Sequence, residues 1–160
     1  MSIKVGDKVP SVTLRYLTPD GVKAVSSDEF FAGKKVALFA VPGAYTQTCS
    51  QRHLTGYVTN AAEIKAKGVD TIACIAVNDP FVMGAWGQEH NCDDRIVMLG
   101  DGSAEFTRAV GLELDRMKEG MGMRSQRYSM LVDNGVVKAL HIEEPGQFSV
   151  SSAETMLQAL

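Results

Sequence analysis

One cysteine of the chain stands where a thiol becomes reactive. A run of apolar and β-branched residues, 35–41, predicts a buried strand that ends at Pro42. The polar stretch that follows predicts a helix beginning near Thr46, with Cys49 in its first turn. Unpaired backbone N–H groups and the helix dipole stabilise a thiolate at that position. Cys49 is therefore predicted to be a nucleophile rather than a buried structural thiol.

The segments around this cysteine predict the scaffold that positions it. Predicted strands cover residues 13–16, 22–25, 35–41, 71–77, 96–99, 128–132 and 136–142. Predicted helices cover a short segment from Ser26, then 46–67 with a bend at Gly56, 80–89, 103–110, and a last helix capped by Ser151 and Glu154. This order predicts an α/β fold, in which a central sheet with parallel βαβ units carries helices on both faces.

Length and composition set the broad class of the protein. A chain of 160 residues without repeats or a linker predicts a single domain, 1–160. A net charge of -3 without a basic patch argues against nucleic acid as a partner, and no apolar run is long enough for a membrane span. Three cysteines without framework spacing favour a reducing compartment. A cytoplasmic location is therefore expected, and an organellar one after removal of a presequence stays open.

Pro42, Thr46 and Cys49 also form the pattern Pro-x-x-x-Thr/Ser-x-x-Cys, which His53-Leu54-x-Gly56-Tyr57 follows. This stretch resembles the active-site loop of type II (atypical, peroxiredoxin-5-like) peroxiredoxins. Later segments agree with the resemblance, namely Val77-Asn78-Asp79, Trp86-Gly87 and Arg127-Tyr128-Ser129-Met130. The resemblance implies a thioredoxin-like fold with an N-terminal hairpin and an inserted helix.

The resemblance also implies an activity. It points to a thiol-dependent peroxidase that reduces hydrogen peroxide and alkyl hydroperoxides through a sulfenic acid on Cys49. Thioredoxin, glutaredoxin or glutathione would supply the reducing thiol, the protein would be a homodimer, and no metal, haem or flavin is implied. The alternative from another class is a thioredoxin-fold redox sensor or binding protein, whose Cys49 reacts once and turns over little.

The same resemblance assigns three supporting residues. It implies that Thr46 aligns the peroxide, while its hydroxyl is also suited to cap the helix. Pro42 would end the strand and shield the sulfur from water. From the sequence alone Arg127 would be an ordinary surface charge before a strand; the resemblance makes it the cation that lowers the thiol pKa and binds the peroxide oxygen. It is favoured over Arg124 for this role.

His53 raises an alternative chemistry. It follows Cys49 by one helical turn, so a Cys–His hydrolase or a metal pair is conceivable. By residue type, Cys49 and His53 together with His90 and Cys92 would provide four metal ligands. The spacings match no zinc signature, and no Asn or Asp is placed to orient His53, so neither reading is favoured.

Cys74 is the candidate resolving thiol. Its spacing from Cys49 is similar to that in plant and some bacterial type II peroxiredoxins. However, Cys74 lies in the middle of a predicted buried strand, and a disulfide would require the first turn of the active-site helix to unwind. An external thiol is therefore expected to attack the sulfenic acid. Cys92, in a polar segment after a helix, is expected to be dispensable.

Overall fold

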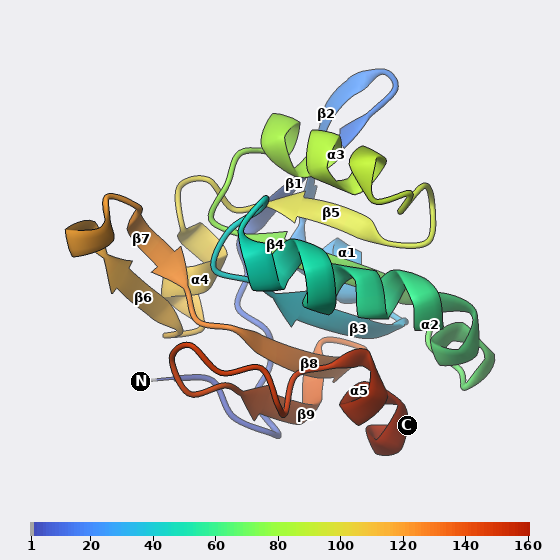
Figure 1. Cartoon of the computed structure of the whole chain (residues 1–160). Helices are drawn as coiled ribbons and strands as arrows, with labels where there is room; N and C mark the ends of the chain where they lie inside the picture. Colours follow the sequence, from blue (N-terminus) through green and yellow to red (C-terminus); the bar gives the residue numbers. More distant parts are fainter. Residues whose placement is uncertain (1) are drawn as a thin grey trace.

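The computed structural model describes residues 2–160, apart from the side chain of Cys49. One large sheet contains the strands β1 (Thr13–Thr18), β2 (Gly21–Ser26), β3 (Lys35–Ala40), β4 (Thr71–Ala76), β5 (Val97–Gly100), β8 (Tyr128–Asp133) and β9 (Val136–Ile142). Among the described residues their order is β2-β1-β5-β4-β3-β8-β9 (Figure 1). The central strands β5, β4 and β3 are parallel, and the flanking strands pair antiparallel. The predicted sheet with parallel units is confirmed.

Helices cover both faces of this sheet, as the alternation of patterns predicted. They are α1 (Ser27–Phe31), α2 (Thr55–Ala66), α3 (Pro80–Glu89), α4 (Glu105–Ala109) and α5 (Ala153–Ala159). Apolar side chains of α2, α3 and α5 pack on one face, and those of α1 and α4 pack on the other (Figure 1). Because β3 and β4 are covered on both faces, they appear in the sequence as nearly continuous apolar runs. Within the described part, no helix combines the length and apolar character needed to cross a bilayer.

Two local features differ from the sequence predictions. A second, two-stranded sheet joins β6 (Glu113–Arg116) and β7 (Gly122–Ser125) around the short helix η2 (Met117–Glu119), and the sequence pattern did not reveal it. Its strands are too short and too mixed in charge to show a clear alternation. The last helix is capped by Ser152, whose hydroxyl accepts from the N–H of Thr155, and not by Ser151. Ser151 is instead buried and bonded elsewhere.

Candidate active site

The helix that carries Cys49 changes its winding at the site. It begins at Gln47, passes through a π-helical segment η1 (Cys49–Leu54) and continues as α2. The wider turn ends at Leu54, two residues before Gly56, where the sequence predicted a bend. The hydroxyl of Thr55 donates to the carbonyl of Ser50 at 2.8 Å, which gives a partner to a carbonyl in the widened turn. Such π-helical turns occur often at functional sites.

The loop between β3 and this helix is held from several directions. The hydroxyl of Thr46 donates to the carbonyl of Gly43 at 2.8 Å, and the N–H of Ala44 donates to Oδ1 of Asn78 at 3.0 Å. A Cβ atom at Gly43 would lie only 3.0 Å from Nη1 of Arg124, so the close approach favours glycine here. The backbone of Cys49 follows in η1, while its side chain lies outside the described part.

Arg127 lies directly before β8 and lines the same pocket as Thr46 and Pro42. Its Nη1 donates to Nδ1 of His53 at 2.9 Å, and its guanidinium lies 5.8 Å from the ring centroid of Phe148. Arg124 lies behind the loop: it donates to the carbonyls of Met121 and Val77, at 2.8 Å and 3.3 Å. These two arginines therefore occupy different environments.

His53 is fully buried, and the structure gives both of its ring nitrogens a partner. Nε2 donates to the carbonyl of Ser151 at 2.9 Å, and Nδ1 accepts from Arg127. Burial and, second, the Arg127 charge lower the pKa of His53 to about 3, so the ring is neutral. A neutral ring with both nitrogens engaged is suited to orient Arg127, not to act as a base or a metal ligand. Among the described residues, no group of three His, Cys, Asp or Glu could hold a metal ion.

Glu143 is a second buried polar group that sequence reasoning missed; it is 4% exposed. Its Oε2 accepts from the N–H groups of Ser149, Val150 and Ser151, each at 2.8 Å, and from the Ser151 hydroxyl at 2.7 Å. Burial raises the pKa of Glu143, but these hydrogen bonds outweigh burial and the pKa is lowered. The carboxylate thus organises the segment that follows β9.

A pocket of about 290 Å³ joins the predicted site residues. Pro42, Thr46 and Arg127 line it, together with Gln47 and Thr48. The β6–β7 sheet and the segment after β9 contribute the other lining residues, which are Leu114, Arg116, Met121, Gln126, Glu143, Glu144, Pro145, Gly146 and Gln147. Polar and apolar side chains are therefore mixed in this lining, as in a pocket for a small molecule.

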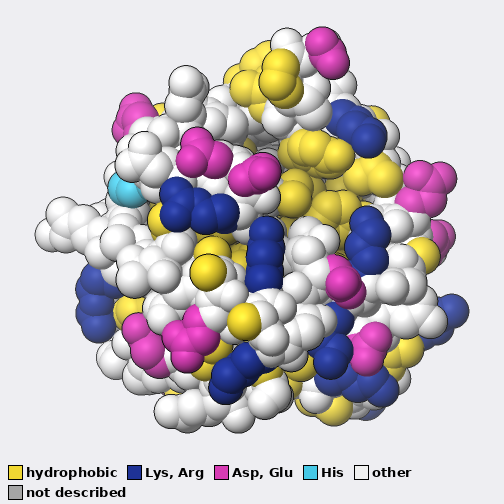
Figure 2. All heavy atoms as spheres, turned by 90° about the vertical axis from the view of Figure 1, so that its right-hand side faces the viewer, with side chains coloured by type: hydrophobic (Ala, Val, Ile, Leu, Met, Phe, Trp, Pro, Cys, Tyr) yellow, Lys and Arg dark blue, Asp and Glu magenta, His cyan; other side chains and the backbone are white. Residues whose placement is uncertain are grey.

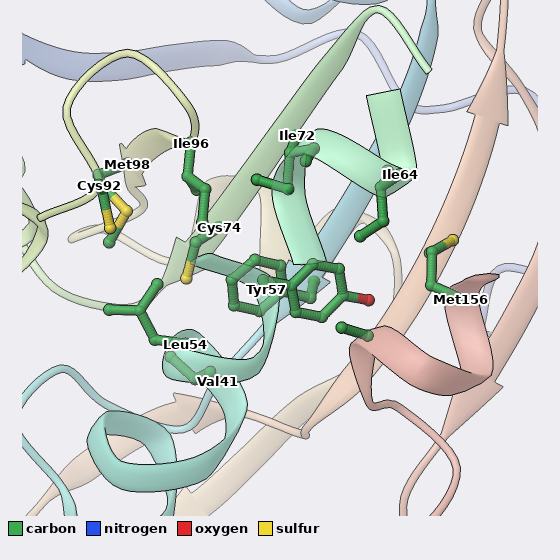
Figure 3. Packing of buried hydrophobic residues seen from close by; sticks show 14 of the residues in the cluster. Val41, Leu54, Tyr57, Ile64, Ile72, Cys74, Cys92, Ile96, Met98 and Met156 are labelled. Carbon is green, nitrogen blue, oxygen red and sulfur yellow. The ribbon is translucent and has the colours of Figure 1, made fainter. Parts of the chain in front are cut away.

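Cys74 and Cys92 lie in a different, apolar environment. Both are buried, and Figure 3 shows Cys74 among Leu54, Tyr57 and Ile96, with Cys92 beside Met98. Cys92 follows α3 in a polar segment, as the sequence indicated, but its side chain is only 1% exposed. Burial raises the pKa of the Cys92 thiol to about 11. Neither thiol lines the pocket with Thr46 and Arg127.

A second hollow lies over Cys92, between α3 and the β1–β2 hairpin. Its volume is about 370 Å³, and Leu17, Pro19, Gly87 and Met98 contribute to its mainly apolar lining. Figure 2 shows this side of the molecule, where hydrophobic side chains gather at the height of the hairpin while acidic and basic side chains are scattered around them. This hollow is separate from the pocket at Thr46.

Comparisons with known proteins agree with this geometry. The Redoxin family matches residues 4–157. Peroxiredoxin-2E, chloroplastic, of Arabidopsis thaliana is 53% identical over 99% of this chain and 70% of its own length. The crystal structure of reduced Prx3 from Vibrio vulnificus in complex with hydrogen peroxide has a TM-score of 0.95 and 54% identity, with 98% of both chains covered. That of peroxiredoxin 5 from Alvinella pompejana has a TM-score of 0.86 and 39% identity, covering 98% of this chain and 97% of its own. These likenesses confirm the predicted thioredoxin-like fold.

Proposed function

Because the chain belongs to the peroxiredoxin family, as a thiol-dependent peroxidase of the type II branch, we propose that Cys49, Thr46, Arg127 and Pro42 carry its chemistry. The observation that supports this assignment is the single pocket in which Pro42, Thr46 and Arg127 meet at the start of the helix containing Cys49. Among the described residues, the hollow over Cys92 and the pocket near the N-terminus have no arginine in their lining.

In the proposed reaction the Cys49 thiolate attacks one oxygen of the hydroperoxide. A sulfur–oxygen bond forms as the O–O bond breaks, which leaves a sulfenic acid and, after protonation of the leaving oxygen, water or an alcohol. Thr46 already donates its hydroxyl proton to Gly43, so it presents an acceptor oxygen for the O–H of the peroxide. Pro42, half-buried at the wall of the pocket, has the proposed role of shielding the sulfur from water.

Arg127 supplies positive charge to this pocket. Its guanidinium is permanently charged and carries several N–H donors in one plane, of which one is directed at His53. Because His53 is neutral, it orients the guanidinium without competing with it for an anion. The proposed role of Arg127 is to lower the pKa of Cys49 and to donate to the oxygen that gains charge as the O–O bond breaks.

A thiol must then reduce the sulfenic acid, and we propose that it comes from outside. The candidates are thioredoxin, glutaredoxin and glutathione. The first thiol forms a mixed disulfide with Cys49 and releases water, and a second thiol frees Cys49. Cys74 is fully buried in the middle of β4, paired with Phe39 and Met98 of the neighbouring strands, so it is poorly placed to do this.

The test is peroxide consumption over many turnovers with each of the three reductants. Cys49→Ser should abolish turnover, because a hydroxyl forms no accessible anion near neutral pH, whereas Cys92→Ser should remain near wild type. Substantial turnover by Cys49→Ser would reject the assignment of the nucleophile. If the wild-type protein consumed a single equivalent with every reductant, the sensor alternative would be preferred instead.

We further propose a homodimer. Tyr45 and Phe81 are 48% and 64% exposed, and large exposed apolar side chains often mark an interface. Trp86, in the same helix as Phe81, is fully buried and contributes nothing to such a surface. Light scattering at micromolar concentration should give the mass of two chains, and a monomeric mass would contradict the proposal. For location, the cytoplasm remains the proposal, with an organelle as alternative because the Arabidopsis relative is named chloroplastic.

A further inference from the structure

The segment after β9 folds back around Arg127. It starts at Glu143, whose N–H donates to the carbonyl of Arg127 at 2.9 Å. Its Phe148 ring lies 5.8 Å from the guanidinium of Arg127 and 5.0 Å from the ring of His53. Its Ser151 presents a carbonyl to His53. One short segment therefore contacts both Arg127 and the residue that orients Arg127.

The carboxylate of Glu143 holds this segment in shape. Three successive N–H groups and one hydroxyl converge on its Oε2, and the Ser149 hydroxyl donates to Oε1 at 3.3 Å. Hydrogen bonds to a charged acceptor are stronger than those between neutral groups. If the carboxylate were removed, these donors would lose their common acceptor, and the position of Ser151 would no longer be determined.

The position of Ser151 matters because it determines the tautomer of His53. The Ser151 carbonyl can only accept, so Nε2 of the neutral ring must carry the proton. Nδ1 is then an acceptor and can receive the N–H of Arg127. In the other tautomer an N–H of His53 would face an N–H of Arg127, and the guanidinium would be turned away.

We propose that Glu143 is a positioning residue of the peroxidase reaction: through Ser151 it selects the His53 tautomer that orients Arg127. This inference rests on the proposed role of Arg127 in the oxidation of Cys49. It assigns no contact between Glu143 and the peroxide. The path joins Glu143 and Ser151 of one short segment to His53 and Arg127, which are distant from it or from each other in the sequence, through the hydrogen bonds of 2.7–2.9 Å described above.

The experiment is a double-mutant cycle on the rate of Cys49 oxidation, measured by stopped flow. Glu143→Ala should slow oxidation about tenfold in the wild-type background, the effect of losing roughly one well-placed hydrogen bond. In the Arg127→Ala background, Glu143→Ala should alter the rate less than twofold, because the arginine that Glu143 is proposed to position is already absent. If Glu143→Ala slowed oxidation by the same factor in both backgrounds, the inference would be overturned.

Two variants separate positioning from simple folding. Glu143→Gln keeps an acceptor oxygen for the N–H groups, so its oxidation rate should be close to that of the wild type. Ser151→Ala removes only the 2.7 Å hydroxyl hydrogen bond, so it should lose less rate than Glu143→Ala, and this loss should again depend on Arg127. Glu154→Ala, at the exposed start of α5, removes the same charge and should have no effect. If Glu143→Gln were as slow as Glu143→Ala, or Ser151→Ala lost rate equally without Arg127, the tautomer path would be wrong.

Nitrogen NMR of ¹⁵N-labelled histidine gives a readout that a purely structural role would not change. Wild-type His53 should show a protonated Nε2 and an unprotonated Nδ1, and Glu143→Ala should mix the two tautomers. An unchanged spectrum in a slow Glu143→Ala variant would overturn the inference.

The oxidation rates also separate this inference from the proposed function of Arg127. If Arg127→Ala were oxidised at the wild-type rate, the proposed function of Arg127 would fail. If Arg127→Ala were slow and Glu143→Ala were oxidised at the wild-type rate, only the present inference would fail.

Discussion

The polar region beside the pocket and the apolar region around Cys74 and Cys92 both contain buried polar groups, but they affect the charge of these groups in opposite ways. Beside the pocket, His53 and Glu143 are buried but bonded to Arg127, to Ser151 and to backbone N–H groups. In the apolar cluster between the sheet and its helices, Cys74 of β4 and Cys92 after α3 are buried among apolar side chains. The first region keeps a neutral imidazole and an ionised carboxylate in fixed positions, whereas the second raises the pKa of a thiol and so keeps it unreactive.

The difference shows that burial alone does not determine what a polar group does. Burial opposes charge in both regions, because a charge loses hydration in either of them. At Glu143 several donors compensate for that loss, and at Cys92 the effect of burial prevails over the nearby charges. The reactivity of a side chain in this protein therefore depends on the partners that its neighbouring segments provide.

The largest effect expected from breaking the polar region comes from Arg127. Arg127→Ala should slow the second-order oxidation of Cys49 roughly 10²-fold, because a preorganised charged donor to the peroxide is lost. Stopped-flow kinetics with hydrogen peroxide measures this. Arg127→Lys keeps the charge but lacks the planar guanidinium, so its rate of Cys49 oxidation should lie between those of the wild type and Arg127→Ala. A wild-type rate in Arg127→Ala would show that the polar region does not make Cys49 more reactive than the buried thiols.

A smaller effect should appear in the stability of the polar region toward acid. The pKa of His53 is about 3 in the fold against an ordinary 6.5, so the unfolded chain takes up a proton first as the pH falls. The free energy of unfolding should therefore reach its full value well above pH 6.5 and lie about 1.4 kcal/mol below that value at pH 5.5. The lowered pKa of Glu143 adds to the loss at lower pH.

Urea unfolding between pH 7.5 and 4.5 measures this loss. His53→Gln retains one donor and one acceptor but does not titrate, so its stability should depend much less on pH in this range. The explanation fails if the variant and the wild type show the same pH dependence.

The smallest effect is expected in the apolar region. Cys74→Ser should keep turnover within about twofold of wild type with glutaredoxin or glutathione, since we propose that an external thiol reduces the sulfenic acid. Intact mass spectrometry after one equivalent of peroxide should show the sulfenic acid or its external adduct. An abundant Cys49–Cys74 disulfide, together with loss of turnover in Cys74→Ser, would mean that the two regions communicate during catalysis.

Local sequence patterns were sufficient to predict the scaffold. The apolar runs of β3 and β4 depend on neighbouring residues, and the structure has these strands where they were expected. The helix predicted over 80–89 and the strands predicted over 128–132 and 136–142 are also present. The resemblance named Pro42, Thr46 and Arg127, which the structure brings to one pocket. Their catalytic roles remain predictions.

The orienting network could not be predicted, because it joins residues that are distant along the chain. Nothing near His53 indicates that its partners are Arg127 and Ser151, and nothing near Glu143 indicates that it would be buried. The helix cap was assigned one residue too early for the same reason, since Ser151 bonds to Glu143 and leaves the cap to Ser152. The local sequence offers one weak indication of this network, namely that serines follow Glu143 within a few residues and can donate to its carboxylate.

The chain also carries its own optical reporter. Trp86 is its single tryptophan, and it is fully buried in α3. Its indole N–H donates at 2.8 Å to the hydroxyl of Ser50, the residue that follows Cys49. Unwinding of the first helical turn must break this bond and bring water to the indole, so the intrinsic fluorescence of the unlabelled protein follows the opening of its own active site.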